Sequence, residues 1–332
     1  MSFWKSMVLP MALAVGLVAA PAAAQDKIRI ALVVKSLGNG FFEAARRGAE
    51  DAAKEVGNVE IIYTGPTSTT AEGQIEVINS LISQKVDAIA VSANDPDALV
   101  PALSKAMQRG IKVISWDSGV AAKGRILHLN PSSNALIGAT NLKLAAAALP
   151  DGKGEVAILS ATATSTNQNI WIEEMKKALP GYPGLKLVAT VYGDDLSDKS
   201  YRETQALLKA HPEVKAIIAP TSVGIVAAAQ AVKDAGKIGQ VYVTGLGLPS
   251  EMAGAIKSGA SKSFAIWNPI DLGYTATLLA YDLVKAKATS AAGTTLKAGR
   301  MGEIAIGPNG EAAMSEPFTY DASNIDQFAK IF

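Results

Sequence analysis

The sequence predicts an α/β fold of two similar lobes, each a parallel sheet with helices on both faces. Short runs rich in β-branched and apolar residues alternate along the chain with stretches whose apolar residues recur every three or four positions. Strands that alternate with helices form parallel sheets covered on both sides. The alternation runs twice, and a chain of 332 residues is long enough for about two domains.

The predicted strands are short apolar runs, as expected of strands that are buried on both faces. They span 27–34, 59–64, 87–93, 112–118 and 125–130 in the first half of the chain, and 155–161, 185–191, 215–221, 240–246 and 261–267 in the second. Residues 300–307 predict one late strand. The first helix is indicated by one apolar stripe, formed by Phe41, Ala45, Ala49, Ala52 and Val56.

Two helical segments, near 134–149 and 270–285, follow the strands that should end the two sheets, so we expect the chain to cross between lobes there. Proline and small polar residues at 130–134 and 267–269 indicate hinge points. The first lobe is therefore expected to comprise 25–131 and 268–297, and the second lobe 132–267 and 298–332.

The first 24 residues have the pattern of a secretory signal, which predicts a periplasmic protein. Lys5 precedes an apolar run, and small residues allow cleavage after about Ala24. The run is too short for a stable membrane span, and an uncleaved anchor is the alternative. Without Lys5 the 31 basic residues become 30, against 30 acidic ones, so no nucleic-acid partner is expected. The chain has no cysteine, which excludes disulfides and thiolate zinc sites.

Polar and aromatic residues gather after the predicted strands, where ligands bind to open parallel sheets. The candidates for ligand binding are Lys35, Phe41, Phe42, Asn94, Asp117, Asn167, Gln168, Trp171, Pro220, Thr221, Ser222, Trp267 and Asn268. Amides, hydroxyls, a carboxylate and a lysine can satisfy the hydroxyl edge of a pyranose, and rings can cover its apolar faces. Any single ring could instead belong to the core, and Asp117 could cap a helix. The clustering favours a sugar site.

Motifs for nucleotide binding or catalysis are missing. A dinucleotide fingerprint would need a third glycine where Glu43 stands, and there is no P-loop, nucleophile elbow or zinc-protease motif. The two histidines, His128 and His211, do not suggest a catalytic triad. We therefore expect a binding protein, not an enzyme, without a cofactor.

Two acidic stretches could suggest a cation, but each has a simpler interpretation. Asp95 and Asp97 are expected to cap a helix. Residues 193–199, "GDDLSDK", are interpreted as a solvated loop, with a cation site as the open alternative. No metal is expected.

From Lys27 to Phe332 the chain resembles the type 1 periplasmic sugar-binding proteins of ABC importers. The motifs that carry the likeness are "GFFEAARRGAEDAAKEVG", "IEVINSLISQKVDAIAVSANDPDALVPALSKAMQRGIKVISWDS" and "GLGLPSEMAGAIKSGASKSFAIWNPIDLG". "STNQNIWIEEMKK" and "TVYGDDLSDKSYRE" are most similar to rhizobial rhamnose-binding proteins, and autoinducer-2-binding proteins have the same layout. The resemblance implies two Rossmann-like lobes, three hinge crossings and closure over one small ligand.

The resemblance also implies roles for individual residues. Lys35, Asp117, Gln168 and Pro220 match ligand-contacting positions of the autoinducer-2 receptors. Asn167 replaces an aspartate of those receptors, and Ser222 replaces an alanine, which favours a sugar over autoinducer-2. Ribose binders carry an arginine where this chain has Ser118, and an acid in the turn that here reads "GLGLP", so ribose is disfavoured.

The function predicted from the sequence is therefore capture of a monosaccharide by hinge closure, with L-rhamnose as the expected sugar. Delivery to the transmembrane subunits of an ABC permease would follow, with the protein acting as a monomer. The alternatives are an autoinducer-2 receptor, a binder of another pentose or deoxyhexose, a chemoreceptor ligand carrier, a repressor of the same fold and a secreted enzyme. The secretory signal stands where a repressor would have its DNA-binding helices.

Overall fold

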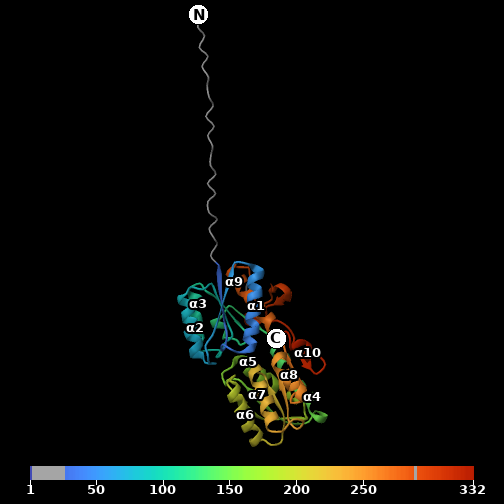
Figure 1. The fold of residues 1–332 in the computed structure, drawn as a ribbon. Helices are drawn as coiled ribbons and strands as arrows, with labels where there is room; N and C mark the ends of the chain where they lie inside the picture. Colours follow the sequence, from blue (N-terminus) through green and yellow to red (C-terminus); the bar gives the residue numbers. More distant parts are fainter. Residues whose placement is uncertain (2–26, 288–289) are drawn as a thin grey trace.

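The fold is shown by a computed structural model, which describes Met1 and residues 27–287 and 290–332. It consists of two α/β lobes, one above the other in Figure 1, and confirms the predicted fold class. Residues 2–24 of the expected secretory signal lie outside the described residues. Within the described part of the chain, no helix is long and apolar enough to cross a membrane.

The first lobe is built on a six-stranded parallel sheet with the order β13-β5-β4-β3-β1-β2. Its elements are β1 (Ile28–Val33), α1 (Gly40–Val56), β2 (Val59–Thr64), α2 (Ala71–Ser83), β3 (Ala88–Val91), α3 (Val100–Gln108), β4 (Lys112–Trp116), β5 (Leu127–Asn130), α9 (Pro269–Val284), β11 (Thr295–Lys297), β12 (Glu303–Ala305) and β13 (Glu311–Ala313).

The second lobe has a four-stranded parallel sheet with the order β7-β6-β8-β9. Its elements are α4 (Asn134–Ala148), β6 (Gly154–Ser160), α5 (Thr166–Ala178), β7 (Leu185–Tyr192), α6 (Ser197–Ala210), β8 (Val214–Ala219), α7 (Ser222–Asp234), β9 (Tyr242–Gly245), α8 (Pro249–Ser258), β10 (Ser263–Ile266), β14 (Phe318–Asp321) and α10 (Ile325–Phe328). A parallel bridge between Leu246 and Ala265 joins β10 to this sheet, and β14 then pairs with β10 in the antiparallel sense.

Helices cover both faces of each sheet, as the sequence pattern predicts. In the first lobe α1 and α9 lie on one face and α2 and α3 on the other (Figure 1). Alternation along β1 explains this arrangement: Ile30 and Leu32 are buried under α1 and α9, and Ala31 and Val33 under α2 and α3. Both faces of this sheet are therefore core, and only its edges and strand ends are free for ligands.

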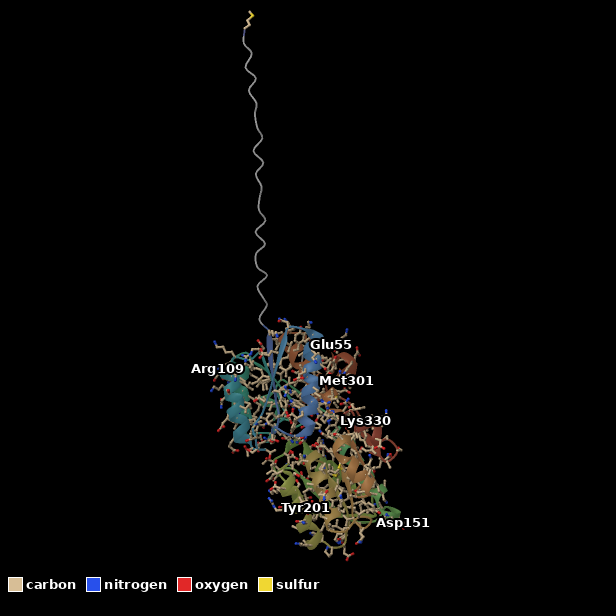
Figure 2. All side chains as sticks on the ribbon, viewed as in Figure 1. Glu55, Arg109, Asp151, Tyr201, Met301 and Lys330 are labelled. Carbon is tan, nitrogen blue, oxygen red and sulfur yellow. The ribbon has the colours of Figure 1, made fainter. Side chains whose placement is uncertain are left out.

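Within residues 27–287 and 290–332 the chain crosses between the lobes three times, after β5, after β10 and after β13. The third boundary expected from the sequence, at 297/298, is wrong because β13 pairs with β5 in the first sheet. Met301 accordingly lies on the first lobe with Glu55 and Arg109, whereas Asp151 and Tyr201 lie on the second (Figure 2). Residues 298–313 thus belong to the first lobe.

The late strand predicted over 300–307 is confirmed only as β12 (Glu303–Ala305). Strands β11, β13 and β14 were not predicted, and each has only three or four residues. Such short strands show no periodicity of their own, because one or two alternations cannot be distinguished from a loop.

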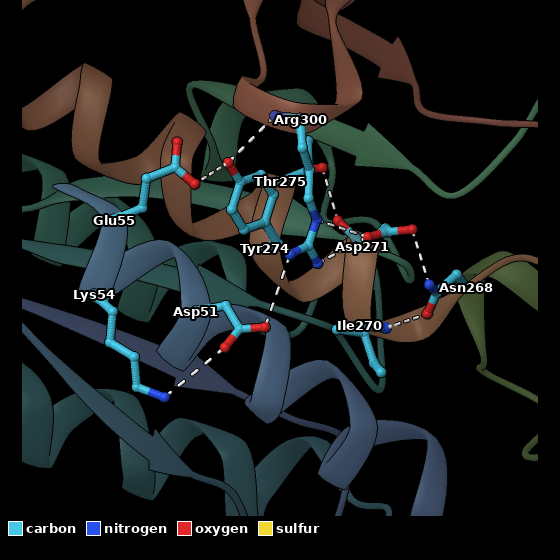
Figure 3. Close-up of polar contacts among 9 residues, drawn as sticks. All are labelled: Asp51, Lys54, Glu55, Asn268, Ile270, Asp271, Tyr274, Thr275 and Arg300. Carbon is cyan, nitrogen blue, oxygen red and sulfur yellow. Dashed lines mark hydrogen bonds and ion pairs between the residues drawn. The ribbon is translucent and has the colours of Figure 1, made fainter. Parts of the chain in front are cut away.

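Helices α1 and α9 approach each other closely through their backbones, and polar side-chain contacts also connect them (Figure 3). The Tyr274 hydroxyl donates to Glu55 over 2.5 Å, and the Arg300 guanidinium lies 4.2 Å from the centre of the Tyr274 ring. Arg300 also pairs with Asp271 at 2.8 Å and with Asp51 at 3.8 Å. These contacts connect α1, α9 and the turn before β12, so the returning chain is integrated into the first lobe.

We expect stability to depend on pH through His128, a buried residue of β5. Its ring nitrogens lie 2.9 Å from Ser115 Oγ and 3.1 Å from Asn130 Oδ1. Burial, with a smaller effect of the nearby Arg125 charge, lowers its pKa from 6.5 to about 4. Below about pH 6.5 the His128 ring therefore binds a proton in the unfolded chain but stays neutral in the folded one. The free energy of unfolding is thus highest above that pH and falls as the pH is lowered toward about 4.

The expected loss from this group is about 2–3 kcal/mol between about pH 7 and about pH 4.5. Urea unfolding of the parent and of His128→Gln at both pH values measures it, because the variant lacks the titrating ring. The parent should lose more stability than the variant by that amount. Equal losses in the two proteins would show that His128 is not the responsible group.

Candidate functional site

A cavity lies between the two lobes at the carboxyl ends of their strands, where the sequence predicts the ligand. It contains about 390 Å³ of space outside protein atoms, open solvent included. The residues that line it are Lys35, Asn39, Phe41, Phe42, Asp117, Asn167, Gln168, Trp171, Asp195, Pro220, Thr221, Ser222, Leu246, Ile266 and Trp267. Eleven of the thirteen predicted residues are among them.

Lys35 connects the two lobes directly. It follows β1 in the first lobe, and its ammonium donates to Ser165 Oγ at 2.8 Å and to Asn167 Oδ1 at 2.9 Å in the second. Burial lowers the pKa of Lys35, and the carboxylates of Asp117 and Asp195 oppose this effect. The lobes are thus in contact across the cavity, and the conformation is a closed one.

Asp117 is the buried carboxylate of the first lobe and directly follows β4. Ser92 Oγ donates to its Oδ2 at 2.8 Å, and Asn167 Nδ2 donates to its Oδ1 at 3.1 Å. Burial raises the pKa of Asp117, while Lys35 and the two hydrogen bonds act in the opposite direction. Each oxygen therefore has one protein donor, and each retains lone-pair capacity for a ligand hydroxyl.

Gln168 is oriented to donate. Its Oε1 accepts from Ser160 Oγ at 2.9 Å and from the Ala161 amide at 2.6 Å. Among the described residues, no partner is found for its Nε2, which leaves that donor for a ligand. The side chain comes from the first turn of α5, so the fold fixes its position.

Aromatic rings form one corner of the cavity. Phe41 and Phe42 start α1 and pack edge to face, and Phe41 makes the same contact with Trp267 at 6.2 Å between ring centres. Trp267 in turn contacts Trp171 at 5.6 Å. These rings come from both lobes and contact one another, so closure brings them together into one aromatic cluster. The Trp267 indole N–H is buried and has no partner in the described part of the chain.

Two predicted site residues do not line the cavity. Asn94 instead holds the Lys35 loop, donating to the Lys35 carbonyl at 2.9 Å and to the Thr70 carbonyl at 3.2 Å. Asn268 is the N-cap of α9, since its Oδ1 accepts from the Ile270 amide at 2.9 Å (Figure 3). Both positions were inferred from strand ends, but side chains there can also serve the backbone.

Four lining residues were not predicted: Asn39, Asp195, Leu246 and Ile266. Leu246 and Ile266 end apolar runs, and a sequence gives no sign that such a residue faces a ligand. Asp195 belongs to the stretch interpreted as a solvated loop, and that interpretation is wrong for this side chain.

The acidic stretches offer no metal site in the part of the chain that the structure describes, where no group of three or more possible ligands is found. Asp95 Oδ1 accepts from the backbone amides of Asp97 and Ala98 at 2.9 and 2.8 Å. It therefore caps the turn that leads into α3 and not the helix itself, whose N-cap is Leu99 without a side-chain hydrogen bond, so the predicted helix cap is wrong.

The family is decided by a model described as "Periplasmic binding protein domain", which matches residues 30–288. The chain belongs to this family. Its resemblance to periplasmic binding proteins is thereby confirmed. A D-ribose/D-allose-binding protein of Pseudomonas aeruginosa is 32% identical over 66% of this chain and 70% of its own length. The D-allose-binding periplasmic protein of Escherichia coli is 28% identical, covering 77% of this chain and 84% of that protein.

Solved structures of periplasmic binding proteins have the same two-lobed form. An ABC transporter solute-binding protein of Clostridium phytofermentas, with bound L-rhamnose, is 38% identical. It superposes with a TM-score of 0.88, covering 92% of this chain and 99% of that one. LsrB from Clostridium saccharobutylicum, in complex with AI-2, has a TM-score of 0.85 with 91% and 99% coverage. At 23% identity, LsrB shows a shared fold alone.

Proposed function

We propose that this periplasmic binding protein captures a monosaccharide, with L-rhamnose as the preferred ligand, and delivers it to an ABC permease. It acts in the periplasm as a monomer and does not transform the sugar. The observation that carries the proposal is the cavity between the lobes, which polar side chains from both lobes line together with a cluster of aromatic rings.

The polar side suits the hydroxyl groups of an uncharged sugar. Asp117 offers acceptors, Lys35 and Gln168 offer donors, and the unpartnered Trp267 N–H is a further donor. A buried donor without a partner costs free energy, so a ligand oxygen at that point would be favoured. Amide and carboxylate groups can each bind two neighbouring hydroxyls of a ring.

The apolar corner favours a 6-deoxyhexose over the parent hexose. Leu246 and Ile266 line the cavity together with the rings, and these two aliphatic side chains can receive a methyl group but cannot hydrogen-bond a sixth hydroxyl. The identity of the sugar as L-rhamnose is supported by the rhamnose-bound Clostridium phytofermentas protein. The same corner disfavours pentoses, which would leave it unfilled.

Ligand capture uses the hinge. The three crossings allow the lobes to separate, and a sugar bound to one lobe stabilises closure through contacts with the other. In the closed form Thr164 of the second lobe donates to the Asn94 carbonyl at 3.1 Å, and Thr69 of the first donates to the Asp194 carbonyl at 2.8 Å. A permease can distinguish the closed outline from the open one and so accept only loaded protein.

Calorimetric titration tests the proposal with L-rhamnose, L-mannose, L-lyxose, D-ribose and autoinducer-2. L-Mannose adds the sixth hydroxyl to rhamnose, and L-lyxose lacks the sixth carbon, so the series isolates the methyl group. We expect rhamnose to bind most tightly. A preference for autoinducer-2 or ribose would overturn the choice of sugar, and recovery of altered sugar after incubation would indicate an enzyme.

Trp267→Ala is expected to weaken rhamnose binding about 30-fold, because it removes an apolar wall and a donor, together worth about 2 kcal/mol. Trp267→Phe keeps a ring and is the matched control, with an expected loss of about fivefold. Thermal unfolding of both variants verifies that they are folded. Unchanged affinity in Trp267→Ala would show that this ring does not touch the sugar.

A further inference from the structure

The loop after β7 brings a second carboxylate to the cavity. Asp194 and Asp195 are adjacent, but they have different environments. Asp194 Oδ2 pairs with Lys199 at 2.5 Å and does not line the cavity. Asp195 lines it together with Asp117, which belongs to the other lobe. The closed cavity thus holds one acid from each lobe.

The backbone at this position is unusual. Asp194 and Asp195 have φ angles of 56° and 54°, in the left-handed region, and Asp117 has 57°. Glycine adopts this conformation at the lowest cost, and other residues there are uncommon. Such strain gathers at functional sites. Asp194 and residues away from the cavity, such as Lys85, share this conformation, so it supports a role for Asp195 only together with the place of that side chain in the cavity.

Hydrogen bonds fix both the loop and the carboxylate. The Gly193 amide donates to the Ser160 carbonyl at 2.9 Å, and the Asp194 amide donates to the Ala161 carbonyl at 3.1 Å. The Thr221 hydroxyl donates to Asp195 Oδ1. In the described part of the chain, no partner is found for Asp195 Oδ2.

Thr221 can orient Asp195 because its own hydroxyl has little freedom. Thr221 is the N-cap of α7, and its Oγ1 accepts from the Gly224 amide at 3.2 Å. The hydroxyl proton is therefore directed at Asp195, which fixes the carboxylate plane and leaves Oδ2 as an acceptor. The same loop contacts the first lobe through Thr69, which donates to the Asp194 carbonyl. Its position is thus coupled to closure.

We propose that Asp195 is a specificity-determining residue that accepts a hydrogen bond from one sugar hydroxyl in the closed form. Asp117 and Asp195 hold different edges of the ring, one from each lobe. This inference rests on the proposed function, because it requires a hydroxylated ligand in the cavity. It explains how the second lobe recognises a sugar that the first lobe has already bound.

The experiment combines protein variants with altered ligands. Asp195→Asn removes the charge and keeps the shape, and Asp195→Gly removes the side chain while suiting the left-handed backbone. Asp194→Asn is the matched control, with the same charge change one residue away. Each protein is titrated with the monosaccharide that the parent binds most tightly and with its single-deoxy derivatives. Thermal unfolding verifies folding.

We expect Asp195→Asn to weaken binding about tenfold and Asp195→Gly more, with Asp194→Asn within about twofold of the parent. One deoxy derivative should bind the parent and the Asp195 variants with similar affinity, because it lacks the hydroxyl that Asp195 accepts. Parental affinity in Asp195→Gly, or an equal loss with every derivative, would overturn the inference. Binding of no monosaccharide by the parent itself would instead remove the proposed function, and the inference with it.

Discussion

Replacing Asp117 with glycine is expected to reduce sugar affinity by about 100-fold or more. Asp117 is the buried acid of the first lobe, and each of its oxygens already has one protein donor. A hydrogen bond to a charged group contributes about 1.5–3 kcal/mol, so two sugar hydroxyls bound here would account for about 3–6 kcal/mol. The loss also leaves the buried Lys35 ammonium without the stronger of its two favourable carboxylate interactions.

The choice of variants follows from the backbone. Alanine would add strain, because Asp117 has a φ of 57°, whereas glycine and asparagine tolerate that conformation. Asp117→Asn separates charge from shape, and we expect an intermediate loss of about 30-fold because neutral hydrogen bonds are weaker. Calorimetric titration measures both variants. If Asp117→Gly binds the sugar as tightly as the parent, this carboxylate is not a ligand contact.

The fold could be predicted from the sequence where periodicity extends over enough residues. β2 occupies the predicted 59–64, and α4 and α9 lie within one residue of the expected crossover segments. β10 was predicted as one more strand of a parallel sheet, and a parallel bridge does join it to that sheet. Its antiparallel pairing with β14 was not predicted. That pairing joins segments more than fifty residues apart, and no local pattern contains it. The third lobe boundary, expected at 297/298, was wrong for the same reason, because β13 pairs with the distant strand β5.

The candidate site was predictable to the extent that strand ends determine it. The carboxyl ends of parallel strands lie at one edge of the sheet, so residues such as Lys35 and Gln168 could be predicted to line the same site. Asp195 was missed because it stands three residues beyond β7, in a run of polar residues typical of a solvated loop. Its turn toward the cavity depends on left-handed backbone angles and on Thr221, neither of which the local composition reveals.

Gly48→Ala and Gly273→Ala are each expected to destabilise the protein by about 3 kcal/mol, at the upper end of the cost of overpacking. Helices α1 and α9 meet backbone to backbone at these glycines. A Cβ on Gly48 would overlap the Ile270 carbonyl oxygen and lie 2.9 Å from the Tyr274 nitrogen. A Cβ on Gly273 would overlap the Ala45 carbonyl oxygen. Backbone atoms cannot rotate away as a flexible side chain can, so the helices must separate.

Whether the change from glycine to alanine lowers or raises the free energy of unfolding distinguishes a close helix contact from an open site. In an open helical site, glycine to alanine stabilises by about 0.5–1 kcal/mol, because alanine loses less backbone entropy on folding. Gly254 in α8 is such a site, since a Cβ there would meet no atom within 4 Å. Gly254→Ala is therefore the control, and urea unfolding should show it to be more stable than the parent while both α1–α9 variants are less stable.

Because α1 also carries Phe41 and Phe42 at its start, separation of the two helices should weaken sugar binding as well. Stabilisation by Gly48→Ala would contradict the close contact and, with it, the position of the aromatic corner.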